Sequence, residues 1–301
     1  AASFFYNYFS SFLRALGNSI VPLIFLACSA VLNIGLDLWF VIGLSRGTAG
    51  AAEATVISQY ISGIGILIYT WIKFPEIRRA LFRFQSASLK EIANFSFLTC
   101  IQQSVMNLGI LMVQGLVNSF GTTIMAAFAA AVKIDSFAYM PVQDFGNAFS
   151  TFIAQNYGAK KKERIRQGLR GALLSSMIFC IIISILIWLF AKPLMLLFIK
   201  PHETAILAEG IRYLHIEGSF YCGIGCLFLL YGLYRALGKP EMSLVLTIIS
   251  LGTRVFLAYQ LSAIPFFGVV GIWWSVPIGW FLADLAGILY YLIARRRTEL
   301  F

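Results

Sequence analysis

Residues 8–37 read YFSSFLRALGNSIVPLIFLACSAVLNIGLD, two apolar segments joined by a turn whose centre is Arg14 to Gly17. The sequence of this turn, Arg-Ala-Leu-Gly, occurs again from Arg235 to Gly238, 221 residues further on. Other matches at the same offset are Gly47 with Gly268, Gly50 with Gly271, and Tyr69 with Tyr290. Matches in one ungapped register, within segments of similar hydropathy, predict an internal duplication.

The composition excludes an ordinary soluble domain. Hydrophobic residues make up 59% of the chain and charged residues 12%, with a mean hydropathy of +0.83, whereas a soluble domain carries about 25% charged residues. The apolar runs are solid and about twenty residues or longer, which predicts helices and not the alternating strands of a membrane β-barrel. We therefore expect an all-α polytopic membrane protein.

Nine hydrophobic spans are predicted, separated by short polar turns that contain glycine or proline. They cover about residues 1–16, 20–44, 51–72, 92–119, 122–156, 168–198, 205–236, 241–263 and 268–294. Pro141 and Pro277 lie inside two of these spans and are expected to kink them.

The placement of Lys and Arg predicts the orientation of the chain. Most of the 23 basic residues lie in every second loop or at the C-terminus. By the positive-inside rule these loops face the cytoplasm, and so does the C-terminus. The net charge of +10 is therefore a topology signal, and no nucleic-acid partner is predicted. The richest loops contain Lys73, Arg78, Arg79, Arg83 and Lys90, and the segment 160–170.

Residues 73–91 form the one long amphipathic connection, which predicts a cytoplasmic linker with a helix along the membrane surface. The lobe after it, residues 92–301, holds six of the nine spans, and residues 1–72 hold three. An offset of 221 residues then predicts a first lobe of six spans too, with about 130 further residues before this chain begins. Because each lobe has an even number of spans, both lobes have the same orientation in the membrane. The expected architecture is therefore a twelve-helix, 6+6 parallel-repeat transporter, of which nine helices are seen.

Three stretches resemble the multidrug and toxic compound extrusion (MATE) family, with the greatest similarity to its DinF-like bacterial branch. They are FLRALGNSIVPLIFLACSAVLNIGLDLWFVIGL (12–44), YRALGKPEMS (234–243) and residues 113–165, which include AAVKIDSFAYMPVQDFGNAFSTFIAQNYGAKKKERI. The resemblance covers essentially the whole chain and corresponds to helices 4–12 of the family's twelve. It implies two six-helix lobes around a central cavity and export of organic cations or other amphipathic compounds in exchange for protons or sodium.

Asn33 and Asp37 lie four residues apart in the second span, on one face of a helix. A carboxylate at membrane depth must be protonated, paired or facing water. Thr55 follows on the next span, 18 residues after Asp37. In archaeal MATE transporters an Asn, an Asp and a Thr at this spacing line a site in the first lobe, so the resemblance implies a cation-coupling site at Asp37, Asn33 and Thr55. A purely structural Asn/Asp pair between helices is the alternative.

Amide side chains mark the span after the linker. Gln103, Asn107, Gln114 and Asn118 follow one stripe of a helix. Such a stripe can line a water-filled cavity, or it can bind neighbouring helices through hydrogen bonds, and the pattern does not choose between these.

Some family members carry acidic residues in the seventh and tenth helices. The corresponding regions of this chain show Gln102 and Gln103, and the segment Cys222 to Cys226, with Glu217 as the nearest acid. The resemblance therefore favours coupling through the first lobe alone, with protons favoured over sodium.

Charged residues within the later spans complete a predicted substrate cavity. Arg254 occupies the position that duplicates Asn33, so the two copies have diverged at a polar face. Charged residues within the membrane either form structural ion pairs or mark functional sites, and the sequence leaves both possibilities open here. The predicted cavity residues are Gln103, Asn107, Gln114, Lys133, Asp135, Tyr139 and Arg254.

These features predict an antiporter of alternating access and not an enzyme, because no nucleophile or acid-pair motif occurs. No cofactor or metal is expected beyond the coupling ion, H⁺ or Na⁺, since the five cysteines lie in apolar runs without ligand spacing. Small amphipathic or cationic substrates and the lipid bilayer are the expected partners of a monomer in a bacterial inner membrane. The alternative is a flippase for lipid-linked precursors, which would need a more cationic cavity than Lys133 and Arg254 provide.

Overall fold

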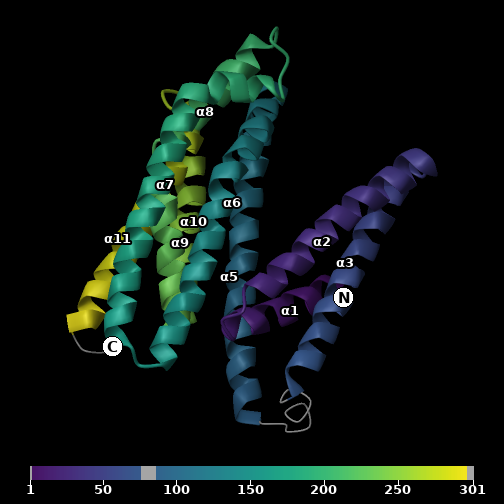
Figure 1. Cartoon of the computed structure of the whole chain (residues 1–301). Helices are drawn as coiled ribbons and strands as arrows, with labels where there is room; N and C mark the ends of the chain where they lie inside the picture. The colour runs from purple at the N-terminus through teal and green to yellow at the C-terminus, as the bar shows by residue number, and fades with distance from the viewer. Residues whose placement is uncertain (1, 76–85, 297–301) are drawn as a thin grey trace. The chain divides into compact units, whose positions relative to one another are not determined.

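The computed structural model describes residues 2–75 and 86–296, and within these residues the chain forms only helices and the turns between them (Figure 1). It divides into two compact units, residues 1–89 and 90–301. The expectation of an all-α chain holds for the described residues. Part of the expected linker, residues 76–85 with Arg78, Arg79 and Arg83, lies outside them.

Unit 1 is a packed set of helices joined by tight turns. It contains α1 (Ala2–Ala15), α2 (Ile20–Asp37), the π-helical segment η1 (Leu38–Gly43) and α3 (Gly47–Lys73). Both α1 and α2 pack against α3. Serine hydroxyls hold α2 to α3, because Ser29 Oγ donates to Ser58 O at 3.1 Å and Ser62 Oγ donates to Phe25 O at 3.2 Å. Such small polar residues allow close packing of membrane helices.

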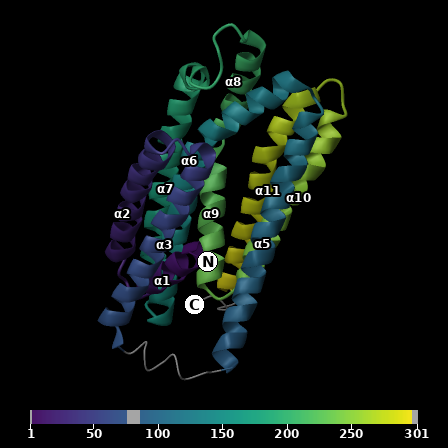
Figure 2. The ribbon, with the colours of Figure 1, turned by 90° about the vertical axis from the view of Figure 1, so that its right-hand side faces the viewer.

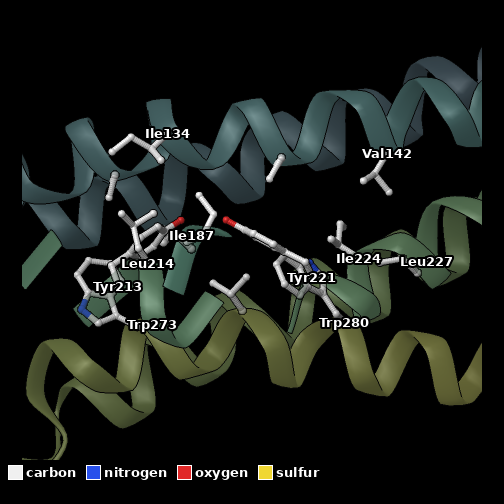
Figure 3. Packing of buried hydrophobic residues seen from close by; sticks show 14 of the residues in the cluster. Ile134, Val142, Ile187, Tyr213, Leu214, Tyr221, Ile224, Leu227, Trp273 and Trp280 are labelled. Carbon is white, nitrogen blue, oxygen red and sulfur yellow. The ribbon is translucent and has the colours of Figure 1, made fainter. Parts of the chain in front are cut away.

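Unit 2 contains the remaining long helices and the larger core. They are α5 (Ser86–Asn118), α6 (Thr122–Gly158), α7 (Lys162–Leu196), α8 (Thr204–Gly218), α9 (Tyr221–Ala236), α10 (Pro240–Ser262) and α11 (Gly268–Arg296). Figure 2 shows the long helices α5, α10 and α11 from the side. The core is apolar and aromatic, with Tyr213, Tyr221, Trp273 and Trp280 buried among branched aliphatic side chains (Figure 3).

The number of membrane spans differs from the nine expected. Seven helices of the described residues are long and apolar enough to cross a membrane, and an eighth span is obtained if α8 and α9 are counted together. These two helices are bent by 52° at Ser219–Phe220, where an unbroken span over 205–236 was expected. The helix α1, of which 14 residues are described, is not among these spans. The count of nine is therefore not confirmed.

The repeated turn has the same backbone geometry in both copies. In unit 1, Gly17 N donates to Arg14 O, and Asn18 N donates to Leu13 O. The residues 221 positions later form the equivalent bonds, Gly238 N to Arg235 O and Lys239 N to Tyr234 O. Both glycines have positive φ, +84° and +75°, a conformation that closes the C-terminus of a helix and favours glycine.

A close contact at the glycine that follows each hairpin is also present in both copies. A Cβ on Gly50 would lie 3.0 Å from Phe40 Cβ, and one on Gly271 would lie 2.6 Å from Leu261 Cβ. Gly271 and Leu261 lie 221 residues after Gly50 and Phe40. The offset found in the sequence therefore corresponds to matching local structure in the two units.

Two glycines bring α6 and α9 into close contact. A Cβ on Gly232 would lie 2.6 Å from Gly146 O, and a Cβ on Gly146 would lie 2.9 Å from Phe228 O. Both clashes involve backbone atoms, which cannot rotate away. The contact sets the distance between two helices that also line the cavities described below.

Replacing Gly232 with Leu is expected to destabilise unit 2 by about 1–3 kcal/mol or more, because the new side chain must push α9 away from α6. The measurement is the thermal unfolding midpoint of the purified protein in detergent. Gly171 of α7 is the matched control, since it is exposed and its Cβ would meet nothing within 4 Å. Equal midpoints for the two leucine variants would contradict the close packing.

Candidate functional sites

In unit 1 the structure brings Asn33 and Thr55 together. Asn33 Nδ2 donates to Thr55 Oγ1 at 3.4 Å, and Thr55 Oγ1 donates in turn to Ala51 O at 2.9 Å. The first contact joins α2 to α3 across 22 residues of sequence. The two residues predicted to share a coupling site are thus neighbours across a helix pair.

Asp37 lies one turn beyond Asn33, at the last position of α2. Its Oδ1 atom is buried and has no hydrogen-bond partner in the described part of the chain. A buried carboxylate oxygen without a donor is costly, so it needs a proton, a cation or a water molecule.

The backbone changes form directly after Asp37. Residues Leu38–Gly43 are π-helical, and Leu44 N donates to Trp39 O, five residues back. In the second copy, α10 continues as an ordinary α-helix to Ser262, beyond the residue that corresponds to Leu38. Short π-helical segments are frequent at functional sites. The irregular backbone is thus confined to the copy that carries the Asp.

A cavity of about 250 Å³ lies within unit 2. Helices α5, α6, α8, α9, α10 and α11 contribute its walls. Its lining residues include the predicted Gln114, Asp135, Tyr139 and Arg254, together with Tyr213, Glu217, Phe128, Phe228, Tyr231 and Trp280. The walls thus combine aromatic and aliphatic side chains with a few polar and charged groups.

Two carboxyl groups and one guanidinium group face this cavity. Tyr221 donates its hydroxyl hydrogen to Asp135 Oδ1 at 2.5 Å, and Tyr213 donates to Glu217 Oε2 at 2.7 Å. Asp135, Glu217 and Arg254 are close enough to interact electrostatically. The Glu217 Oε1 and Arg254 Nε atoms are buried and have no hydrogen-bond partner among the described residues.

The aromatic walls are held by ring packing. The rings of Phe128 and Trp273 stack at 5.4 Å between centroids, and Tyr139 meets Phe228 edge to face at 5.1 Å. Tyr213 and Trp273 also meet edge to face, at 5.0 Å (Figure 3). Aromatic faces beside carboxylates are a favourable environment for an organic cation.

A second, smaller cavity of about 160 Å³ adjoins the first. It is lined by Thr99, Gln102, Gln103, Met106, Gln143, Asn147, Phe228, Tyr231 and Arg235. Met106, Phe228 and Tyr231 line both cavities and so form the wall between them. Four of its lining residues, Gln102 and Gln103 of α5 and Gln143 and Asn147 of α6, have amide side chains.

The predicted cavity residues separate into three groups. Gln114, Asp135, Tyr139 and Arg254 line the larger cavity, and Gln103 lines the smaller one. Asn107 is exposed and lines neither. Lys133 is also exposed, and its ammonium group lies over the ring of Phe198, 5.8 Å from the centroid.

Two members of the amide stripe line cavities, Gln114 the larger and Gln103 the smaller, whereas the helix-binding amide is the neighbouring Gln102, outside the stripe. Gln102 Nε2 donates to Thr247 Oγ1 at 3.0 Å and so ties α5 to α10. Gln114 Nε2 donates to Asn118 Oδ1 at 2.9 Å along the same helix, while its side chain also lines the larger cavity.

Glu217 is not among the predicted cavity residues, although it lines the larger cavity. In the sequence it is only the acid nearest an expected position, yet the residue is 2% exposed and lines the same cavity as Asp135. Its partner Tyr213 is four residues earlier, a spacing that could have indicated a shared helix face. No local pattern could have indicated the hydrogen bond between Tyr221 and the predicted Asp135, because the two residues are 86 positions apart.

Comparisons with known proteins agree on one family. The family model described as MatE matches residues 96–260. The "Probable multidrug resistance protein YpnP" of Bacillus subtilis is 32% identical over 97% of this chain, and the "Probable multidrug resistance protein NorM" of Thermotoga maritima is 28% identical over 88%. A crystal structure of a mutant of the Vibrio cholerae MATE transporter VcmN superposes with a TM-score of 0.87 at 25% identity over 98% of this chain.

These matches cover only part of the other proteins. The chain spans 65% of the length of the Bacillus protein, 58% of the Thermotoga protein and 67% of the Vibrio chain.

Proposed function

This chain belongs to the multidrug and toxic compound extrusion (MATE) family, and on that basis we propose that it forms part of a cation-coupled antiporter for organic cations or other amphipathic toxic compounds. Its spans make it a polytopic membrane protein. We place it in the inner membrane of a bacterium, as a monomer with a cytoplasmic C-terminus. Residues 1–72 would be the second half of the N-terminal lobe, 73–91 the linker, and 92–301 the six-helix C-terminal lobe.

The observation that carries the coupling proposal is the buried, unpartnered Oδ1 of Asp37. It lies one turn from the Asn33–Thr55 hydrogen bond and directly before the π-helical segment. A proton on Asp37 would satisfy this oxygen when the site is closed to water. Its release would leave a carboxylate that must face water or a cation, so the protonation state can favour one conformation over another.

The larger cavity of unit 2 is the proposed substrate site. Its volume of about 250 Å³ suits part of a drug-sized molecule, and its walls combine aromatic rings with the Asp135 and Glu217 carboxyl groups. With both carboxyl groups ionised, the formal charge with Arg254 is negative, which favours cations. The flippase alternative needs a cationic cavity, so this negative charge does not favour it. Lys133, which could add positive charge, does not line the cavity.

Reconstitution of the intact transporter in lipid vesicles tests the proposal. A fluorescent organic cation is expected to move against its gradient when a pH gradient is imposed, and a sodium gradient alone is expected to drive none. Transport driven by a sodium gradient alone would identify sodium, and not protons, as the coupling ion. Absence of transport under both gradients, with scrambling of a lipid-linked sugar instead, would favour the flippase.

A further inference from the structure

The antiporter proposal assigns no role to Arg235, the arginine of the repeated turn in unit 2. Arg235, one residue before the end of α9, lines the smaller cavity. Its Nε donates to Tyr231 O at 3.2 Å, and its Nη2 donates to Asn147 Oδ1 at 3.1 Å. Both acceptors are neutral. A guanidinium group has five N–H donors, so these two bonds leave several available.

The electrostatic environment of Arg235 differs from that of Arg254. The Arg254 cavity contains two carboxyl groups, whereas none of the described residues that line the Arg235 cavity is acidic. Within the described residues Arg235 also forms no ion pair. A half-buried guanidinium stays charged, and without a carboxylate it favours an anion from outside the protein.

The other walls of the smaller cavity add neutral hydrogen-bonding groups. Gln102, Gln103, Gln143 and Asn147 present amides, whereas the Thr99 hydroxyl donates its hydrogen to Phe95 O at 2.8 Å. Asn147 uses its side-chain oxygen for Arg235, so its NH₂ group remains a donor. A guanidinium group beside amide donors matches the oxygen atoms of a phosphate or carboxylate.

We propose that the Arg235 pocket binds an oxyanion, the phosphate or carboxylate group of a small molecule or of a lipid headgroup. The pocket volume of about 160 Å³ is sufficient for such a group but not for a whole drug-sized molecule. The shared wall of Met106, Phe228 and Tyr231 places this anion site beside the acidic cavity. Unit 2 thus carries two neighbouring sites of opposite charge preference.

Binding is measured on the purified, intact transporter without any gradient, so a failure here differs from a failure of the proposed transport. Inorganic phosphate is titrated in neutral detergent by calorimetry, and phosphatidylglycerol is compared with phosphatidylcholine in nanodiscs by thermal unfolding. Stabilisation by phosphate indicates a free anion as the ligand. Stabilisation by phosphatidylglycerol alone indicates a headgroup.

Two variants test the assignment to this pocket. Arg235→Gln keeps a donor for Asn147 but removes the charge, and is expected to weaken the binding at least about tenfold. Gln103→Glu keeps Arg235 but supplies a competing carboxylate, and is expected to have the same effect. Arg14→Gln changes the matching residue of the repeated turn and is the control, with binding expected at the wild-type level.

Two results would overturn the proposal. One is a wild-type protein that responds neither to phosphate nor to phosphatidylglycerol. The other is equal binding by the Arg235→Gln and Arg14→Gln variants, whether both bind as tightly as the wild type or both lose binding.

Discussion

Replacing Asp37 with Asn is expected to reduce proton-driven export by the intact transporter to the level of protein-free vesicles. The amide has nearly the same shape as the carboxyl group but cannot take up or release a proton. Since Oδ1 has no hydrogen-bond partner within the described residues, no protein contact to it is lost. The thermal unfolding midpoint is therefore expected to stay within about 2 °C of the wild type.

The control for this experiment is Asp144→Asn. Asp144 is an exposed acid of α6 that lines neither cavity. Its replacement is expected to leave export unchanged, and Asp37→Glu is expected to retain part of the activity because it keeps an ionisable group. Export at the wild-type rate by Asp37→Asn would remove Asp37 from the coupling mechanism.

Opposite changes in affinity are expected when the charges of the larger cavity are altered in opposite directions. The double variant Asp135→Asn with Glu217→Gln leaves Arg254 as the charged group and should weaken the binding of an organic cation. Arg254→Leu leaves the two carboxyl groups and should strengthen it. For a cation about 7 Å away at an effective dielectric of about 20, each charge contributes about 2 kcal/mol, which is more than tenfold in Kd.

Binding of the fluorescent cation to purified protein measures both effects. Lys133→Gln is the matched control, because Lys133 is a charge on the same helix as Asp135 but lies outside the cavity. Its effect should be small. If the double variant and Arg254→Leu shift the Kd in the same direction, the cavity does not select its ligand by charge.

The helix positions were largely predictable because hydrophobic runs and turn residues are local signals. The span predicted at 122–156 is α6, Thr122–Gly158, and the span predicted at 241–263 is α10, Pro240–Ser262. The repeated turn was predictable for the same reason, since a glycine of positive φ after Arg-Ala-Leu is visible in the sequence.

The break between α8 and α9 was not predictable, because contacts distant in sequence surround it. A Cβ on Gly218 would lie 3.0 Å from Ile187 of α7, and Tyr221 is held by Asp135 of α6. Neither partner is visible from residues 204–236. For the same reason, the sequence does not place Glu217 in the predicted cavity but does place Lys133 there, together with Arg254. Periodicity gives the face of a helix, but only packing decides which faces surround a cavity.

The π-helical segment after Asp37 bears on how the two copies diverged. Gly17 and Gly47 are separated by as many residues as Gly238 and Gly268, yet only the first hairpin contains a π-helical segment. The two hairpins thus have the same length, and the difference in backbone form does not require a net insertion or deletion. A stepwise series of single-residue exchanges between the hairpins should be able to convert one backbone form into the other, which makes this ancient divergence accessible to reconstruction in the laboratory.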